Sequence, residues 1–155
     1  MPDELKSLNT YLADKYFCNF SVFQSVPDAW AIDQIFPIVP LQRLNEEPTR
    51  EATLADITCD SDGQIDSFIG FLGAEDTLRV HQVSPEDNYR IGIFLTGAYQ
   101  EILGDLHNLF GDTNTFHVSL REDGSLKYEQ IIKGENVTDV LDYVQFRADE
   151  LAGRM

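Results

Sequence analysis

The chain has 155 residues, with 11 Lys and Arg against 27 Asp and Glu, and a net charge of −16. This charge argues against nucleic acid and anionic membranes as partners, because both repel an acidic surface. It fits a protein that handles a cationic substrate, although acidic surfaces more often serve only solubility. The length fits a single domain over residues 1–155.

The two cysteines, Cys18 and Cys59, are not spaced like a disulfide framework, and the first residues do not have the pattern of a signal peptide. The longest apolar stretches are well short of the ~20 residues that a membrane-spanning helix needs. We therefore expect a soluble, cytoplasmic protein.

The first part of the chain is predicted to alternate helices and short strands. Leu5, Leu8 and Leu12 have helical spacing, whereas the stretch after Tyr16 alternates at period two like a half-buried strand. Pro37 and Pro40 then favour an extended backbone over residues 36–41. In chain order we expect a helix over 5–16, a strand over 17–23, a helical turn over 29–34, an extended segment over 36–41 and a strand over 52–58.

The second part is dominated by predicted strands. Asp123-Gly124 is a strong hairpin signal, and Thr138 can cap a final helix over 138–146. The strands are expected over 76–83, 89–96, 115–120 and 125–132. Strands separated by turn signals at fairly even spacing favour a mainly β fold, an antiparallel barrel or sandwich with a few short helices.

A first candidate site follows the strand that ends at Cys59. Its thiol stands beside the Asp60 carboxylate, a pair that could orient, protonate or bind a cationic group. The plain alternative is a small buried cysteine followed by a turn, since residues 60–63 have good turn chemistry. The three histidines are widely spaced, and no metal site is predicted.

A second candidate site is the polar stretch over 97–114, which follows an apolar run over 91–95. Tyr99 comes just after Gly97, so a phenol emerges where the backbone can approach a ligand closely. Its hydroxyl could donate to a phosphate. The alternative is an aromatic ring that is buried with only its oxygen in water.

Four stretches resemble the carboxy-terminal part of bacterial biosynthetic arginine decarboxylase: residues 20–37, 56–63, 97–113 and 138–146. The resemblance extends from about residue 12 to residue 151. It implies a place among the alanine-racemase-like decarboxylases that depend on pyridoxal phosphate. In these enzymes an amino-terminal α/β barrel carries the Schiff-base lysine, and a carboxy-terminal β-domain completes the active site at a dimer interface. Only the β-domain is matched, and the barrel is not expected in these residues.

The resemblance also implies roles for individual residues. Cys59 is expected to be catalytic and to control protonation of the reacting carbon after carbon dioxide leaves. Asp60 and Asp33 are expected to face the distal cationic end of the substrate, with Asp28 as a rival to Asp33. Tyr99 is expected to hydrogen-bond the cofactor phosphate. Carboxylates suit this substrate, because a guanidinium is a planar fork of donors.

The activity implied is that of a carboxy-lyase, which converts arginine to agmatine and carbon dioxide in polyamine and spermidine biosynthesis. Its expected partners are the cofactor-binding barrel and a second subunit of an oligomer, and the need for magnesium is left open. We expect the 155 residues alone to be inactive. One alternative is a stand-alone, non-catalytic domain that complements or regulates a decarboxylase, and another is an unrelated β-domain that binds a small cation.

Overall fold

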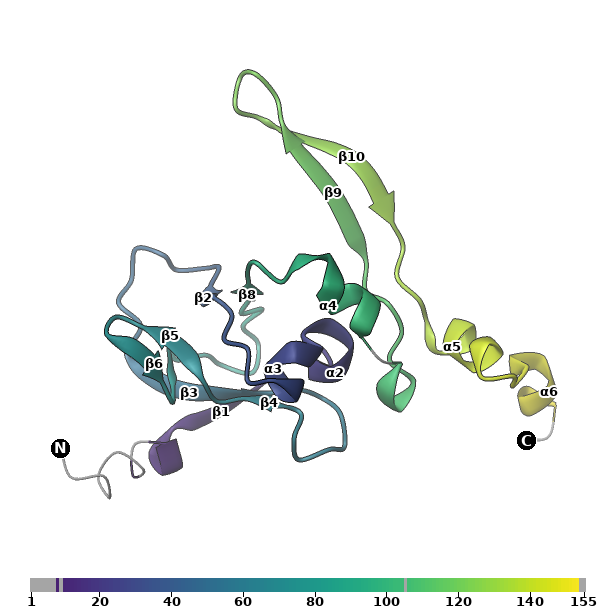
Figure 1. The fold of residues 1–155 in the computed structure, drawn as a ribbon, viewed down its shortest axis with the longest axis horizontal. Coiled ribbons are helices and arrows are strands. Elements are labelled where there is room, and N and C mark those ends of the chain that lie inside the picture. The colour runs from purple at the N-terminus through teal and green to yellow at the C-terminus, as the bar shows by residue number, and fades with distance from the viewer. Residues whose placement is uncertain (1–7, 9, 105, 154–155) are drawn as a thin grey trace. The chain divides into compact units, whose positions relative to one another are not determined.

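The computed structural model describes residues 8, 10–104 and 106–153. Their contacts group into two compact units, Met1–Asp105 and Leu106–Met155, and each is described by itself. Short strands and short helices build both units (Figure 1). The expected single domain over 1–155 stays a prediction.

The main sheet of the first unit is built around β3 (Arg50–Ala55). On one side β1 (Asp14–Phe17) runs parallel to β3, with Asp14 opposite Ala52. Two strands, β4 (Gln64–Ile65) and β7 (Leu78–Val80), pair with β3 in the antiparallel sense. The last four residues of β3 are buried, because this strand lies in the middle of the sheet.

Two smaller antiparallel pairs complete the strands of this unit. In one, β2 (Ile38–Pro40) pairs with β8 (Ile91–Ile93). In the other, β5 (Phe68–Gly70) pairs with β6 (Gly73–Glu75), and the turn between them exposes Phe71 and Leu72 almost completely. Three short helices join the strands: α2 (Val22–Ser25), α3 (Pro27–Ala31) and α4 (Gly97–Leu103).

The hydrophobic core of the first unit lies between the main sheet and the α2 region. Leu54 of β3 and Val80 of β7 are fully buried, as are Val22 and Val26 at the two ends of α2. They belong to one cluster, whose other buried members are Phe36, Ile38, Ala52, Ile65, Phe68 and Leu78. The core therefore holds α2 against the strand that leads into residues 56–63.

The second unit contains a hairpin and two helices. A short 3₁₀ turn, η1 (His107–Leu109), precedes β9 (Thr115–Leu120) and β10 (Leu126–Ile132). The predicted hairpin turn is confirmed, because the Gly124 N–H donates to the Arg121 carbonyl at 2.9 Å. Then follow α5 (Val137–Tyr143) and α6 (Ala148–Ala152).

The helix predicted over 138–146 is confirmed in kind, but its cap is Asn136 rather than Thr138. The Asn136 side chain accepts from the Thr138 and Asp139 N–H groups, and the Asp139 carboxylate accepts the Asn136 N–H at 2.8 Å. This reciprocal capping box satisfies donors that the first turn leaves without partners, so the helix begins one residue earlier than predicted. Val140 of α5 is buried.

Two of the elements predicted near the start of the chain are wrong in part. Residues 8 and 10–12 are helical but β1 begins at Asp14, and residues 5–7 and 9 lie outside the described part of the chain. The strand over 17–23 ends at Phe17, because the Ser21 side chain accepts the Gln24 N–H at 3.3 Å and starts α2.

The expected fold class is confirmed at the coarse level, since short strands are the main elements and all the described helices are short. The described strands form four separate sheets and no closed barrel. Among the described helices, not one combines the length and the apolar character required to cross a membrane.

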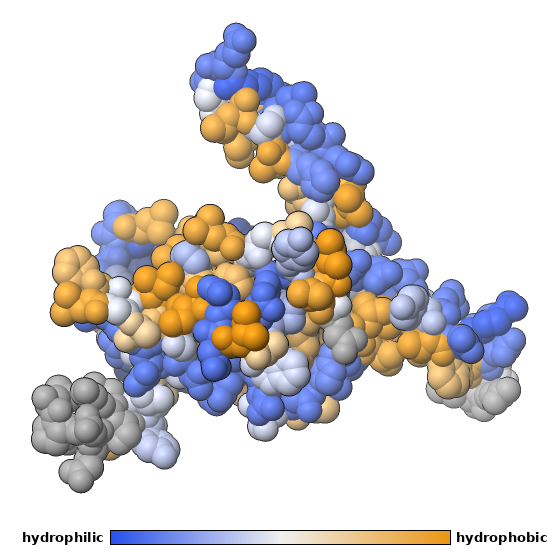
Figure 2. Space-filling view, in the orientation of Figure 1, coloured by the Kyte–Doolittle hydropathy of each residue, from blue (hydrophilic) through white to orange (hydrophobic). Residues whose placement is uncertain are grey.

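The β9–β10 hairpin has one apolar face that is exposed to solvent. Its register places three pairs of apolar side chains on this face: Phe116 with Ile131, Val118 with Tyr128 and Leu120 with Leu126. Each of these six side chains is more than half exposed, and apolar residues are visible along the hairpin in Figure 2. Because a two-stranded hairpin is marginally stable in water by itself, this face requires a covering surface.

We therefore expect the chain by itself to self-associate through the apolar face of the hairpin. Val118→Asp should shift the population measured by sedimentation velocity toward monomer, because a charge on that face opposes its burial. Ser119→Lys, which places a charge on the opposite face beside the Glu129 carboxylate, is the control and should leave the distribution unchanged. A chain that is monomeric at high concentration without any substitution would contradict this expectation.

Candidate functional site

Cys59 and Asp60 lie on the exposed connection between β3 and β4. The chain leaves β3 at Ala55 and re-enters the sheet at Gln64. Both side chains are exposed, so the alternative of a buried Cys59 is wrong. The turn chemistry is present as well, since the Gly63 N–H donates to the Asp60 carbonyl at 3.1 Å. The connection thus presents a thiol and a carboxylate at the surface.

Asp28 and Asp33, the two rivals for a second substrate carboxylate, have different surroundings. Asp28 in α3 is half-buried, and its carboxylate accepts the Gln100 amide at 2.6 Å. Asp33 follows α3 and is exposed, with a φ of 54° that aspartate tolerates better than most residues. Asp28 therefore joins α3 to α4, whereas Asp33 is exposed to solvent.

Tyr99 lies in the first turns of α4 and is 75% exposed. Within the polar stretch over 97–114, this helix begins at Gly97, where a φ of 69° favours glycine. The alternative of a buried aromatic ring is wrong. The phenol is held on a helix with its hydroxyl accessible.

Hydrogen bonds tie these segments to the pair of helices α2 and α3. The Gln100 side chain, itself buried, accepts the Asp28 N–H at 3.2 Å and so joins α4 to α3. The Asp56 carboxylate accepts the Val22 N–H at 2.9 Å and so joins the end of β3 to α2. Contacts also join α4 to α2 and β4 to α3. The candidate residues from three distant stretches therefore stand on segments packed around one helix pair.

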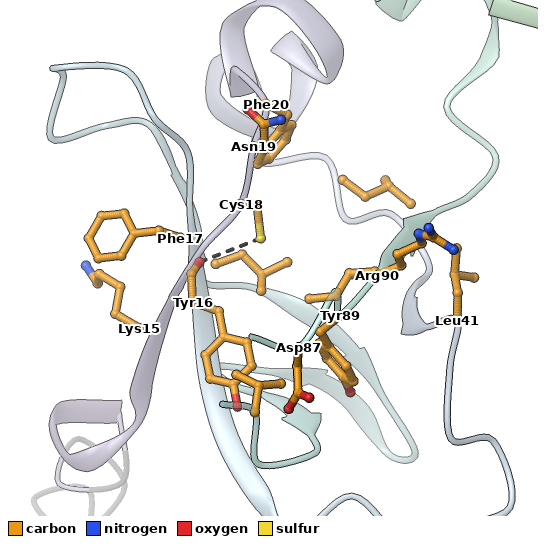
Figure 3. Close-up of a pocket in the computed structure, with 14 residues that line it drawn as sticks. Lys15, Tyr16, Phe17, Cys18, Asn19, Phe20, Leu41, Asp87, Tyr89 and Arg90 are labelled. Carbon is orange, nitrogen blue, oxygen red and sulfur yellow. Dashed lines mark hydrogen bonds between the residues drawn. The ribbon is translucent and has the colours of Figure 1, made fainter. Parts of the chain in front are cut away.

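A separate cavity of about 740 Å³ lies between β1 and β8, and it contains none of the candidate residues (Figure 3). Its walls are mostly apolar and include Phe20, Leu41, Leu54 and Ile93. The cavity forms between segments that are distant in sequence, so no local sequence pattern indicates it.

Two titratable side chains of the cavity wall are held in their neutral forms. Burial raises the pKa of the Cys18 thiol. Burial also raises the pKa of Tyr16, and the negative charge of Asp14 adds to this rise. The Tyr16 hydroxyl donates to the His81 carbonyl at 2.7 Å.

The described residues contain no group of three or more His, Cys, Asp or Glu side chains placed to hold a metal ion. The charged residues of the candidate site are carboxylates. Their chemistry suits a cationic organic group such as a guanidinium.

No family model matches the chain. The chain is similar to several curated proteins and to one solved structure, all of them biosynthetic arginine decarboxylases. It is 60% identical to the biosynthetic arginine decarboxylase of Phocaeicola vulgatus and 61% identical to that of Bacteroides thetaiotaomicron. Each match covers 97% of the chain and 24% of the relative. The relative from Gloeobacter violaceus is 57% identical, over 94% of the chain and 23% of its own length.

The crystal structure of the biosynthetic arginine decarboxylase from Campylobacter jejuni matches with a TM-score of 0.78 and 43% identity. The match covers 90% of the chain and 23% of that protein. The chain thus spans about a quarter of the length of the relatives it matches. Over nearly its whole length the chain is similar to the carboxy-terminal portion of biosynthetic arginine decarboxylases.

Proposed function

We propose that the chain is the part of an arginine decarboxylase that completes the active site, and that the complete enzyme converts arginine to agmatine and carbon dioxide. The observation that carries this proposal is the exposure of all four candidate residues, Cys59, Asp60, Asp33 and Tyr99. They stand on segments that a buried and a partly buried hydrogen bond hold in place. Functional side chains that point outward from a fixed scaffold serve a ligand or surface supplied from outside this chain.

The carboxylates of Asp60 and Asp33 bind the distal end of the substrate in this proposal. A guanidinium presents several N–H donors in one plane, and a carboxylate accepts two of them side by side. Paired carboxylates also favour a cation over neutral competitors. The overall charge of −16 attracts such a substrate as well.

The Cys59 thiol supplies the proton that the reacting carbon accepts. Decarboxylation breaks the bond between the α-carbon and the carboxylate of arginine, and carbon dioxide leaves without the bonding electron pair. That pair stays on the α-carbon and must accept one proton to give agmatine. A thiol on an exposed loop can reach into a neighbouring site and transfer this proton.

Tyr99 is the residue that would contact pyridoxal phosphate. Its accessible hydroxyl fits a phosphate oxygen, which accepts hydrogen bonds. The cofactor, when bound, supplies the electron sink for the bond cleavage. The chain contributes one donor to it, and the anchoring lysine belongs to a barrel elsewhere in the complete enzyme.

The proposal also covers architecture and assembly. The four described sheets become parts of an antiparallel barrel or sandwich when the rest of the protein packs against them, because several strand edges are open. The partners are the cofactor-binding barrel and a second subunit, whose site receives Cys59 and Asp60. The complete enzyme works in the cytoplasm and feeds polyamine biosynthesis.

An exchange experiment tests the proposed function. The matching segment of the Bacteroides thetaiotaomicron relative, 61% identical, is replaced by this chain, and carbon dioxide release from arginine is measured with pyridoxal phosphate. The chain alone and the relative without its matching segment are assayed separately and then mixed. We expect release from the exchanged protein and none from the chain alone.

The outcomes separate the candidate functions. Release from the mixture as well would show that the chain completes a split active site. A folded exchanged protein that retains the cofactor but releases no carbon dioxide would count against the proposal, and would favour a non-catalytic domain. Ornithine and lysine serve as matched control substrates, because they lack the guanidinium that Asp60 and Asp33 are proposed to bind.

A further inference from the structure

We propose that Asp56, a residue without a role in the sequence analysis, is a positioning residue that sets the place of the Cys59–Asp60 connection. This inference rests on the proposed function, because it assigns Asp56 an effect on how the connection meets arginine. Asp56 is only 3% exposed and directly follows β3, whose last four residues are buried. Its backbone is therefore fixed by the sheet.

The Asp56 carboxylate joins two parts of the fold. Its Oδ2 accepts the Val22 N–H at 2.9 Å, at the start of α2. Its Oδ1 accepts both the Thr58 N–H at 2.9 Å and the Thr58 hydroxyl at 2.8 Å. Oδ2 thus binds the helix pair, and Oδ1 binds the connection that carries Cys59 and Asp60. Hydrogen bonds to a charged acceptor are stronger than neutral ones, which makes this a firm attachment.

The connection closes back on the same residue. The Asp56 N–H donates to the Gly63 carbonyl at 2.7 Å, and the Asp60 N–H donates to the Thr58 hydroxyl at 3.4 Å. A Cβ at Gly63 would overlap the Asp56 carboxylate and lie 2.6 Å from the Thr58 hydroxyl oxygen. Glycine is therefore needed for the close approach, and the path of residues 57–63 is set by its contacts with Asp56 and Thr58.

This attachment matters for catalysis because Asp33 and Tyr99 are placed by the same helix pair. Asp33 follows α3, and α4 with Tyr99 is joined to α3 through Gln100 and Asp28. The hydrogen bond from the Val22 N–H to Asp56 attaches the Cys59–Asp60 connection to the same pair of helices, α2 and α3. A displacement of about 1 Å in such an arrangement can cost up to about 100-fold in rate.

The test uses the full-length exchanged protein, with kcat and KM for arginine and the affinity for pyridoxal phosphate measured for each variant. Asp56→Asn keeps the size of the side chain but replaces one carboxylate oxygen by an NH₂ group. One of the two backbone N–H groups that Asp56 binds then faces a donor instead of an acceptor. We expect KM for arginine to rise and kcat/KM to fall by about 10-fold to 100-fold. Affinity for the cofactor should change less than twofold, because Tyr99 stands on another segment.

Thr58 supplies a milder pair of variants in case Asp56→Asn fails to fold. Thr58→Val keeps the shape of the side chain but loses the hydroxyl, so it should raise the KM for arginine, as Asp56→Asn does. Thr58→Ser keeps the hydroxyl and should restore the KM of the unsubstituted protein. Tyr89→Phe is the control for a structural effect, since this phenol contacts the buried His81 in a different hydrogen-bond network. It should lower the melting temperature without changing KM.

Unchanged KM in both Asp56→Asn and Thr58→Val would overturn the positioning role, as would an equal rise in Tyr89→Phe. These results differ from a failure of the proposed function. If Asp60→Ala uses arginine as the unsubstituted protein does, the proposed function fails and the inference fails with it. A large effect of Asp60→Ala together with unaffected Asp56 and Thr58 variants overturns the positioning role alone.

Discussion

Replacing Asp60 by alanine in the full-length exchanged protein should reduce kcat/KM for arginine by about 30-fold or more. The variant removes one of the two carboxylates proposed to bind the substrate guanidinium and leaves Asp33 alone, and loss of one member of a desolvated charge pair costs about 2–5 kcal/mol. Affinity for pyridoxal phosphate should stay within twofold of the unsubstituted protein. Steady-state kinetics with arginine, together with cofactor titration by absorbance, checks both parts.

Tyr99→Phe should have the opposite effect: it should weaken the affinity for pyridoxal phosphate and leave the KM for arginine nearly unchanged. It removes a hydroxyl that is proposed to donate to a charged phosphate, a hydrogen bond worth about 1.5–3 kcal/mol, so cofactor affinity should fall about 10-fold or more. KM for arginine at saturating cofactor should change little. The matched control is Asp62→Ala, which removes an exposed carboxylate from the same connection as Asp60 and should affect neither quantity.

An equal loss of both quantities in Asp60→Ala and Tyr99→Phe, accompanied by unfolding, would contradict the assigned roles. It would mean that both side chains support the fold. Their exposure argues against this outcome, since surface substitutions away from a special contact usually change stability by less than about 0.5 kcal/mol.

Leu54→Ala should have the largest effect on stability, a loss of about 2–5 kcal/mol in the free energy of unfolding. Leu54 lies in the central strand β3, is 1% exposed and belongs to the cluster that holds α2 against the sheet. Truncation removes buried methyl groups and leaves a cavity that the surrounding strands cannot fill. Urea unfolding of the 155-residue chain, followed by circular dichroism, measures the change.

Leu44→Ala is the matched control for this prediction. The same atoms are removed, but Leu44 is 79% exposed, so its loss should change the free energy of unfolding by less than about 0.5 kcal/mol. Equal effects of the two substitutions would show that β3 is not the centre of the core. Arginine decarboxylation by the full-length exchanged protein should fall with Leu54→Ala only at temperatures where the variant unfolds.

Local sequence patterns were sufficient to predict the strands that pair with near neighbours. The strand over 115–120 is β9 with the same bounds, and β10 begins one residue after its predicted start. The Asp123-Gly124 turn and the alternation of apolar side chains act over a few residues, so they can be recognised without knowledge of the rest of the fold. The same holds for the helix after Asn136, apart from the identity of its cap.

Patterns failed where a contact distant in sequence decides the local structure. Residues 21–23 belong to the strand predicted over 17–23, yet they lie at the start of a helical turn, because the Asp56 carboxylate and the Ser21 side chain satisfy N–H groups of that turn. The cavity between β1 and β8 was also invisible in the sequence. Each depends on a partner more than 30 residues away, which no local spacing reveals.

The sequence by itself determined the resemblance to biosynthetic arginine decarboxylases and the choice of candidate residues, because chemistry depends on residue type and order. Only the tertiary structure decided how those residues are held. It placed Asp28 in a hydrogen bond with Gln100 and left Asp33 exposed. It also buried Asp56 beneath the connection that carries Cys59. The physical reason is that burial and hydrogen-bond partners arise from packing between segments distant in sequence, and these decide which carboxylate is held by a neighbouring side chain and which is exposed to solvent.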